Sequence, residues 1–399
     1  MKHVQSEKAA STLLEPYRQE ISRCVKCGSC GAVCPPAILG RFESLSARGR
    51  MALIKAVLDK RLPVSAIFKD RLATCTNCLA CEASCPSNVP VTGIIEAAKQ
   101  EVVGESGMGI INHIVSMSLK NGKAIRSLAW LAPFVLHYSR GAMKGRGLGT
   151  SRRRPGSGFV TKEKTGGRVA LFLGCAIGNF QQDIGRAAVT VLNAIGYEVI
   201  VPKGLQCCGR PHLSIGDRKN AEELALKNSA ILGGLQVDAV VTACASCGLT
   251  FKREYPKLLP PGLKKPRVVD VHELLSRGFS HKALRAVQKT ITFHDPCHLG
   301  RGQGLSATAR ALLSSVPGIM LVEMKNADRC CGFGGVMRIT HGEISNAIGR
   351  DKAAMIIATG ASSVATGCPS CRMQIKEALR SAGSDIDVVH TVQLLEEAL

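Results

Sequence analysis

Two cysteine runs near the N-terminus constrain this chain more than any other feature of its sequence. Each run has the spacing C-x2-C-x2-C-x3-C, and proline follows its last cysteine. The short spacers let three sulfur atoms converge on an object a few ångströms across, and the proline turns the chain away because it cannot continue a helix backwards. The two runs are Cys24, Cys27, Cys30, Cys34-Pro35 and Cys75, Cys78, Cys81, Cys85-Pro86.

This spacing resembles that of bacterial ferredoxins, in which three thiolates of one run hold a [4Fe-4S] cube and the fourth crosses to the other cube. The resemblance implies two [4Fe-4S] clusters with crossed ligand sets. A zinc site needs only four thiolates in C-x2-C pairs, and disulfide frameworks rarely pack cysteines this tightly, so both alternatives are less favoured. The implied sets are Cys24, Cys27, Cys30 with Cys85, and Cys75, Cys78, Cys81 with Cys34.

Length and composition indicate how many domains the chain can form and in which redox compartment its cysteines lie. A chain of 399 residues is long enough for two or three domains. It is 45% hydrophobic but has only one tryptophan and four tyrosines, so aliphatic residues must do most of the packing, as in α/β layers. Eighteen cysteines could indicate a secreted disulfide protein. Residues 1–20, however, are polar and lack the apolar core of a signal peptide, so we expect reduced thiols in the cytoplasm.

The N-terminal part is expected to be mostly helical. Apolar residues at helical spacing predict helices near residues 12–23, over 45–59 and over 91–103. Arg48 and Arg50 lie near the start of the second helix, where they could donate to cluster sulfurs, although solvated side chains are the favoured interpretation. We expect a helical domain over residues 1–105 that wraps around two clusters.

A basic connector is expected over residues 106–167. Residues 106–162 contain ten lysines and arginines and no aspartate or glutamate, in a chain whose formal net charge is +22. Their apolar run, 128–136, is much shorter than the roughly 20 residues that span a bilayer. A basic flank beside Trp130 and Phe134 is typical of an interfacial helix on an anionic membrane. The alternative is a buried helix pair with a solvated linker; nucleic acid is less favoured because no recognised motif is present.

From residue 168 the pattern changes to alternating strands and helices, and the same order occurs twice. Strands are predicted over 169–173, 198–201 and 238–242, and again over 290–293, 319–323 and 362–366, with a helix over 187–195. The matched cysteines give an internal duplication of about 123 residues. The pairs are Cys175 with Cys297, Cys207-Cys208 with Cys330-Cys331, and Cys244-x2-Cys247 with Cys368-x2-Cys371.

The place of these cysteines predicts where they gather. Alternating strands and helices form parallel sheets, whose ligands collect beyond the carboxyl ends of the strands. Each cysteine element follows a predicted strand, so the five sulfurs of one repeat should converge at one rim. Gly209 and Gly332 would allow tight turns beside the paired cysteines, and helices starting near Ser246 and Ser370 would direct N–H groups at the thiolates. We expect two duplicated α/β domains with parallel sheets, over 168–280 and 281–399.

The spacing C-x(31)-CC-x(35)-C-x2-C in the first repeat and C-x(32)-CC-x(36)-C-x2-C in the second resembles the cysteine-rich CCG domain family. With the two ferredoxin-type runs in front, the chain resembles the iron–sulfur subunit of glycolate oxidase over residues 20 to 395. It is also similar to iron–sulfur subunits of anaerobic glycerol-3-phosphate dehydrogenase, of lactate utilisation and of heterodisulfide reductase.

The glycolate oxidase resemblance implies an electron-transfer subunit of a glycolate or D-lactate dehydrogenase. Such a subunit takes electrons from a separate flavin (FAD) subunit and passes them towards membrane quinone. It would be cytoplasmic, with peripheral contact to the inner face of the cell membrane. The heterodisulfide reductase resemblance implies instead a catalytic subunit in which the five-cysteine sets hold one or two additional, non-cubane [4Fe-4S] clusters. The candidate ligands are Cys175, Cys207, Cys208, Cys244, Cys247, Cys297, Cys330, Cys331, Cys368 and Cys371.

Other interpretations of the C-terminal half stay open. A smaller metal site such as zinc, or a redox-active thiol pair, would also suit a C-x2-C at a helix start. His294 and His298 flank Cys297 and could donate to a cluster, although histidines at a strand end are more often hydrogen-bonded scaffold.

Nucleotide-binding signatures are missing from the sequence. Gly302-x-Gly304 lacks the third glycine of a dinucleotide fingerprint, and no P-loop is present. Oxidation of a hydroxy acid needs a flavin or a nicotinamide. We therefore expect the isolated chain not to oxidise a hydroxy acid, and to act as one subunit of a complex. A disulfide or thiol reductase is the rival expectation.

Overall fold

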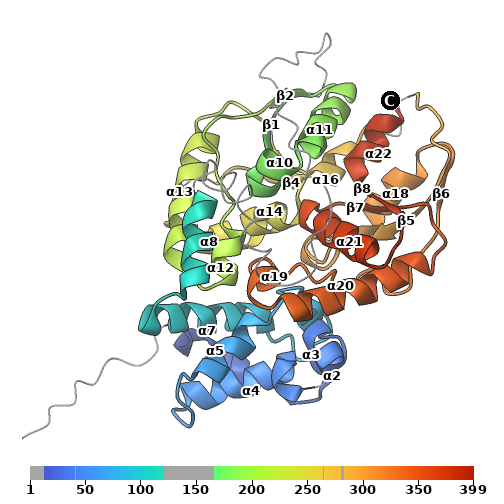
Figure 1. Ribbon diagram of the computed structural model, residues 1–399. Coiled ribbons are helices and arrows are strands. Elements are labelled where there is room, and N and C mark those ends of the chain that lie inside the picture. The colour runs from blue at the N-terminus through green and yellow to red at the C-terminus, as the bar shows by residue number, and fades with distance from the viewer. Residues whose placement is uncertain (1–12, 41, 121–165, 264, 280–282) are drawn as a thin grey trace, which may run out of the picture.

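The structure, a computed structural model, describes residues 13–40, 42–120, 166–263, 265–279 and 283–399. An N-terminal helical domain lies against two α/β repeats (Figure 1). This confirms the fold class predicted from the sequence. Most of the connector, including the apolar run 128–136 and Trp130, lies outside the described residues.

The N-terminal domain consists of short helices packed around one apolar core. The helix predicted near residues 12–23 appears as η1 and α1, and those predicted over 45–59 and 91–103 appear as α4 and α7. The fully buried residues Ile54, Ile94 and Ala98 of α4 and α7 lie at the centre of that core. The Ser46 side chain caps α4 by accepting from the Gly49 N–H. The elements are η1 (Glu15–Tyr17), α1 (Arg18–Ser22), α2 (Ser29–Ala32), α3 (Pro35–Gly40), η2 (Glu43–Leu45), α4 (Ala47–Leu58), α5 (Ala66–Ala73), α6 (Ala80–Ala83) and α7 (Val91–Ser106).

The first repeat is a four-stranded parallel sheet in the order β2-β1-β3-β4. Its central strands, β1 and β3, read as short apolar runs because they are buried on both faces. The strands are β1 (Arg168–Phe172), β2 (Glu198–Ile200), β3 (Ala239–Thr242) and β4 (Val268–Asp270). The helices are α10 (Gly174–Phe180), α11 (Gln182–Ala194), α12 (Arg210–Ser214), α13 (Arg218–Gly233), α14 (Ala245–Leu249), the π-helical η3 (Thr250–Glu254), α15 (Tyr255–Leu258) and α16 (Val271–Leu275).

The second repeat has the same topology, in the order β6-β5-β7-β8. The sequence predicted three strands per repeat, and the structure adds a fourth to each sheet, β4 and β8. The strands are β5 (Lys289–His294), β6 (Ile319–Leu321), β7 (Ser363–Thr366) and β8 (Asp387–His390). The helices are α17 (Gly300–Gln303), α18 (Ser306–Ser314), α19 (Met337–Thr340), α20 (Gly342–Ile357), α21 (Pro369–Ser381) and α22 (Thr391–Glu397).

Each repeat has a helix that packs against a helix of the other repeat. The C-terminal helix α22 packs against α11 of the first repeat, and α16 of the first repeat packs against α18 of the second (Figure 1). Val392 and Leu395 of α22 are therefore part of the apolar core of the first repeat. The two sheets consequently stand side by side as one body.

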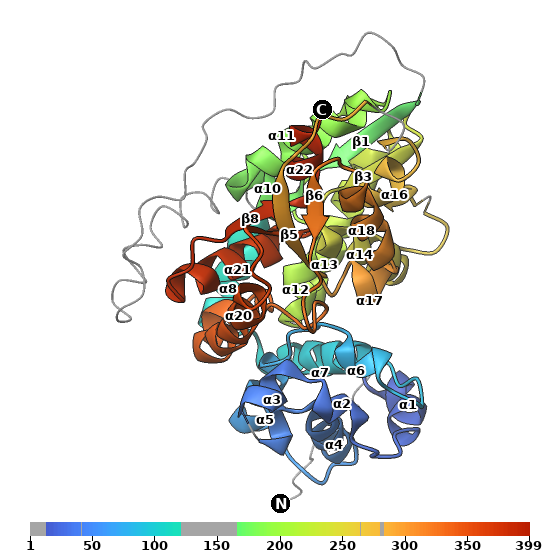
Figure 2. The same cartoon turned by 90° about the vertical axis from the view of Figure 1, so that its right-hand side faces the viewer.

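The N-terminal domain lies on one end of this body (Figure 2). Helix α7 contacts the first repeat through a buried ion pair between Glu96 and Arg210, and through Lys99, which donates to the Ser214 carbonyl at 2.8 Å. Helix α8 (Ile110–Lys120), which belongs to the connector, packs on α13 of the same repeat. The domain thereby faces the rim where the cysteines of both repeats gather.

Candidate metal centres

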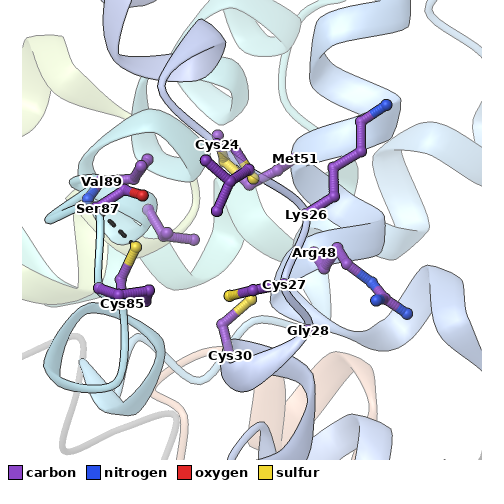
Figure 3. A pocket seen from close by; sticks show the side chains of 13 residues that line it. Cys24, Lys26, Cys27, Gly28, Cys30, Arg48, Met51, Cys85, Ser87 and Val89 are labelled. Atoms are coloured by element: carbon purple, nitrogen blue, oxygen red, sulfur yellow. Dashed lines mark hydrogen bonds between the residues drawn. The ribbon is translucent and has the colours of Figure 1, made fainter.

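The first cysteine set combines one run with a cysteine of the other. Cys24, Cys27, Cys30 and Cys85 line one cavity, and Figure 3 shows their sulfur atoms around a common space. The remaining lining includes apolar residues such as Val25, Met51, Val89 and Val91. Two of the sulfurs also have polar neighbours: Cys27 Sγ lies 3.4 Å from Ser29 Oγ, and Cys85 Sγ accepts from the Val89 N–H at 3.4 Å. We call these four cysteines the first ferredoxin set.

The second set is built in the same way. Burial raises the pKa of Cys34, and the charges of Cys75 and Cys78 raise it further. Burial likewise raises the pKa of Cys81, with contributions from Cys75, Cys78 and Cys34. Cys34 therefore lies with the second run, as Cys85 lies with the first. Cys34, Cys75, Cys78 and Cys81 form the second ferredoxin set.

The two sets fit the group that the sequence predicts. Each brings four soft sulfur donors together, and three of each four come from loops and short helices that the C-x2-C-x2-C spacing forces to turn tightly. In the first run, Gly28 adopts φ +88° immediately before α2, a conformation that glycine accepts readily. Thiolates in this number and arrangement are the ligands of cubane iron–sulfur clusters.

Five cysteines of the first repeat meet at the carboxyl edge of its sheet. Cys207 Sγ lies 3.6 Å from Cys175 Sγ. Contacts with Cys207 and then Cys247 lower the pKa of Cys208 well below its usual range. Cys244 and Cys247, at the start of α14, contact each other. The first CCG set is Cys175, Cys207, Cys208, Cys244 and Cys247, and four of its members are buried.

The second repeat repeats this arrangement. Cys331 Sγ lies 3.5 Å from Cys371 Sγ. Contact with Cys297 is the main cause that lowers the pKa of Cys330, and contacts with Cys330 and Cys371 lower the pKa of Cys331 well below its usual range. The second cysteine of each Cys-Cys pair thus contacts a cysteine of the following C-x2-C element: Cys208 contacts Cys247, and Cys331 contacts Cys371. The second CCG set is Cys297, Cys330, Cys331, Cys368 and Cys371.

The sets are not isolated from one another, which the sequence did not predict. Members of both ferredoxin sets border the same apolar core of the N-terminal domain. Contact with Cys330 raises the pKa of Cys78, and these two cysteines share a small buried cluster with Ala80, so the second ferredoxin set adjoins the second CCG set. Contact with Cys244 of the first repeat lowers the pKa of Cys368 in the second. The two CCG sets therefore meet at the boundary between the repeats.

The expectation that Arg50 is solvated is wrong. Its side chain is fully buried. It donates to Cys34 Sγ at 3.7 Å, to Thr74 Oγ1 at 2.6 Å and to the Arg71 carbonyl at 2.7 Å. The guanidinium thus donates its hydrogen bonds to a backbone oxygen, a hydroxyl and a sulfur, and none of these three acceptors is a carboxylate. Arg48, by contrast, is partly exposed and pairs with Glu43 at 2.7 Å, as expected of a solvated side chain.

The histidines beside Cys297 differ from each other. His298 Nε2 donates to the Asn77 carbonyl and its Nδ1 accepts from Ser246 Oγ, both at 2.9 Å, so it behaves as the expected hydrogen-bonded scaffold. His294 is fully buried, and neither of its ring nitrogens makes a hydrogen bond with the described residues. Burial lowers the pKa of His294 to about 3, which keeps the ring neutral. A position three residues before a cysteine carries no sequence signal that would have revealed this difference.

Family models match both parts of the chain. A 4Fe-4S dicluster domain matches residues 20–89. A cysteine-rich domain matches residues 169–252 and again 291–376, in agreement with the duplication.

Similar proteins cover the chain almost from end to end. A probable glycolate oxidase iron-sulfur subunit of Bacillus subtilis is 30% identical over 95% of this chain and 94% of its own length. One subunit of the fumarate reductase (CoM/CoB) of Methanothermobacter marburgensis is 30% identical over 99% of this chain and 77% of its own length. One subunit of the dihydromethanophenazine:CoB–CoM heterodisulfide reductase of Methanosarcina barkeri is 27% identical over 95% of this chain and 94% of its own length.

The shared domain order and the extent of these matches lead to one conclusion. The chain belongs to the family of iron–sulfur proteins in which a 4Fe-4S dicluster domain precedes two cysteine-rich CCG domains, a family that includes iron–sulfur subunits of glycolate oxidase and of heterodisulfide reductase.

Proposed function

We propose that the chain is the iron–sulfur electron-transfer subunit of a flavin-dependent 2-hydroxy acid dehydrogenase complex, of the glycolate or D-lactate type. The observation that carries the proposal is the series of neighbouring cysteine sets, in which each set adjoins the next. A chain that only transfers electrons needs closely spaced redox groups and no substrate pocket, and this series supplies the spacing. The end-to-end similarity to a probable glycolate oxidase iron-sulfur subunit supports the same role.

The ligand assignments belong to this proposal. The two ferredoxin sets would each hold one [4Fe-4S] cluster, and the two CCG sets would hold one or two further iron–sulfur clusters. When bound, such clusters supply one-electron oxidation and reduction. We order them by the contacts between the sets, which support the sequence first ferredoxin set, second ferredoxin set, second CCG set through Cys78 and Cys330, and first CCG set through Cys368 and Cys244.

The two ends of this series differ in exposure. Cys27 of the first ferredoxin set is exposed, whereas the cysteines where the two CCG sets meet, Cys244 and Cys368, are buried. The exposed end suits contact with a partner that delivers electrons. Because the sequence has no dinucleotide fingerprint, we place the flavin (FAD) on that partner and expect electrons to leave towards membrane quinone.

The proposal is tested in the assembled complex. Cys208→Ala and Cys331→Ala each remove a buried cysteine that contacts two other members of its CCG set. Each variant is expected to abolish electron transfer from the flavin partner to a quinone analogue. Oxidation of the hydroxy acid with an artificial dye that accepts electrons directly from the flavin should be unchanged, and it serves as the control. Quinone reduction at the native rate in both variants would overturn the proposal.

A disulfide reductase is the second candidate, and one observation favours it. The two CCG sets meet through Cys244 and Cys368, so a sulfur-containing substrate held there could contact both. The chain is also similar over nearly its whole length to one subunit of a heterodisulfide reductase. Under this alternative the isolated chain, supplied with a chemical electron donor, reduces small disulfides, and Cys331→Ala removes that activity.

We further propose peripheral contact with an anionic membrane through α8. Ile110, Ile111, Ile114 and Met117 lie on one side of this helix and are 80%, 53%, 47% and 50% exposed. The opposite side holds the helix on the first repeat, where Ser116 contacts Asp217 and Lys120 pairs with Glu223. An apolar face followed by a strongly basic segment suits binding to anionic lipid. Among the described residues, no helix is long and apolar enough to cross a membrane.

Lipid binding is measured by co-sedimentation with vesicles that contain anionic phospholipid. Binding should weaken as salt rises, because charges more than about 10 Å apart are screened at about 0.1 M. Replacement of both Ile111 and Ile114 by asparagine should reduce binding at least several-fold. Ile339→Asn, which changes an isoleucine that is 56% exposed on α19, is the matched control. Equal binding of the double variant and the control would exclude α8 as the contact.

A further inference from the structure

His294 is placed as a ligand would be. It ends strand β5 at the rim of the second sheet. One of its ring nitrogens and the sulfurs of Cys331 and Cys371 all lie within 4.8 Å of one another, so the three atoms could bind the same metal ion. All three residues are buried. Two of these three donors already belong to the second CCG set.

The first repeat provides a direct comparison. Phe172 ends β1 three residues before Cys175, just as His294 ends β5 three residues before Cys297. The strand pairings agree as well, since Phe172 is opposite Thr242 and His294 is opposite Thr366. The cysteines of the two repeats match throughout. The two positions are therefore equivalent in the fold and differ only in the side chain, phenylalanine in the first repeat and histidine in the second.

In the first repeat this position has a purely apolar role. The Phe172 ring packs edge-on against Phe251 at 4.8 Å between ring centroids. A phenyl ring fills this buried space without polar atoms, so the fold itself does not require an imidazole. The histidine of the second repeat therefore needs a separate explanation.

The hydrogen bonding of His294 supplies that explanation. A buried polar atom without a partner costs free energy, on the order of 1–3 kcal/mol. Among the buried histidines that the structure describes, His294 is the one in which both ring nitrogens lack a hydrogen bond. Histidines bound to metal use one ring nitrogen as the ligand and commonly direct the other at a carboxylate, a backbone carbonyl or water. Iron would satisfy the nitrogen that faces the sulfurs.

We propose that His294 is a nitrogen ligand of the iron–sulfur centre held by the second CCG set, and that the first CCG set has sulfur ligands alone. This inference rests on the proposed presence of a centre at the second CCG set. It makes the two repeats inequivalent despite their matched cysteines. Because imidazole ligands raise the reduction potential of an iron–sulfur centre relative to thiolates, the second centre should have the higher potential.

The test uses the full chain, purified without oxygen, with and without ¹⁵N-labelled histidine. Pulsed electron paramagnetic resonance of the second CCG centre should show a strongly coupled nitrogen that changes with the isotope. His294→Phe, which introduces the residue of the first repeat, should abolish this coupling and lower the potential of that centre. His298→Gln is the matched control, because His298 lies on the other side of Cys297 with both nitrogens hydrogen-bonded; it should retain the coupling.

The outcomes separate the two proposals. A centre that is present in the unvaried chain without any isotope-sensitive coupling overturns the His294 assignment and leaves the electron-transfer proposal in place. Coupling that persists in His294→Phe also overturns it. If Cys331→Ala removes no iron and no signal, the second CCG set holds no centre and the His294 assignment fails, whereas the electron-transfer proposal is decided separately by quinone reduction in the assembled complex. The labelling experiment on the wild-type chain needs no substitution, so it still tests the assignment if a variant fails to fold.

Discussion

At the scale of single residues, Arg50 shows how a cation becomes part of the protein interior. Its three contacts use the planar geometry of the guanidinium, whose donors point in fixed directions. One of them is a sulfur of the second ferredoxin set. A positive charge and an N–H donor near a thiolate stabilise the more negative, reduced state of a bound cluster. Arg50 is thus suited to raise the potential of one cluster selectively.

Arg50→Gln should therefore lower the midpoint reduction potential of the cluster held by the second ferredoxin set. A hydrogen bond to a charged group contributes about 1.5 kcal/mol, which corresponds to about 60 mV for a one-electron couple. A redox titration followed by electron paramagnetic resonance measures this shift. Arg48→Gln is the control, because Arg48 is partly exposed and paired with Glu43. A potential that falls equally in both variants would show that Arg50 acts only through its general charge.

At the scale of elements, the turn after each Cys-Cys pair depends on a glycine. Gly209 and Gly332 both adopt φ +91°, a conformation that other residues rarely tolerate. Their surroundings differ. A Cβ atom at Gly332 would lie 2.6 Å from the Ser345 carbonyl oxygen, whereas one at Gly209 would find its nearest neighbours in Ala221 at 3.5 Å. The second repeat therefore encloses its turn more tightly than the first.

The two alanine variants should separate backbone strain from crowding. Gly209→Ala is expected to lower the free energy of unfolding by about 1–2 kcal/mol, the cost of a left-handed conformation. Gly332→Ala adds a clash with backbone, and overpacking costs about 1–3 kcal/mol more. Denaturant unfolding of the two variants under identical anaerobic conditions gives the comparison. Equal losses would mean that the backbone near Ser345 moves aside freely.

The elements also show what the sequence could and could not predict. The central strands and the cysteines that follow them were predictable, because the same short apolar runs and the same cysteine spacing occur twice within one chain. Strands β4 and β8 were not, because no cysteine element follows them and each leads directly into a helix, α16 or α22. Arg50 was misjudged because cationic side chains are seldom buried without a carboxylate. The contact of Cys244 with Cys368 depends on how two repeats pack, and no local pattern encodes that.

At the scale of the whole molecule, the two repeats stabilise each other. Helix α22 belongs to the second repeat by sequence, but its consecutive leucines face different cores. Leu394 packs in the core of the second repeat, and Leu395 packs in that of the first. Because the same body positions both CCG sets, loss of this helix would loosen the rim where Cys244 and Cys368 meet. The arrangement of the cysteine sets thus depends on the packing of helices across the boundary between the repeats.

The two leucines of α22 allow this coupling to be measured at adjacent positions. Leu395→Ala should create a cavity in the first repeat and cost about 2–5 kcal/mol. Faster amide hydrogen exchange is expected in α11, about 200 residues away in sequence, because α22 packs directly on it. Leu394→Ala removes the same side chain from the same helix, but its effect should appear in α21 and β7 of the second repeat. If both variants accelerate exchange in the same segments, the two cores do not act as separate units, and α22 stabilises the molecule only as a whole.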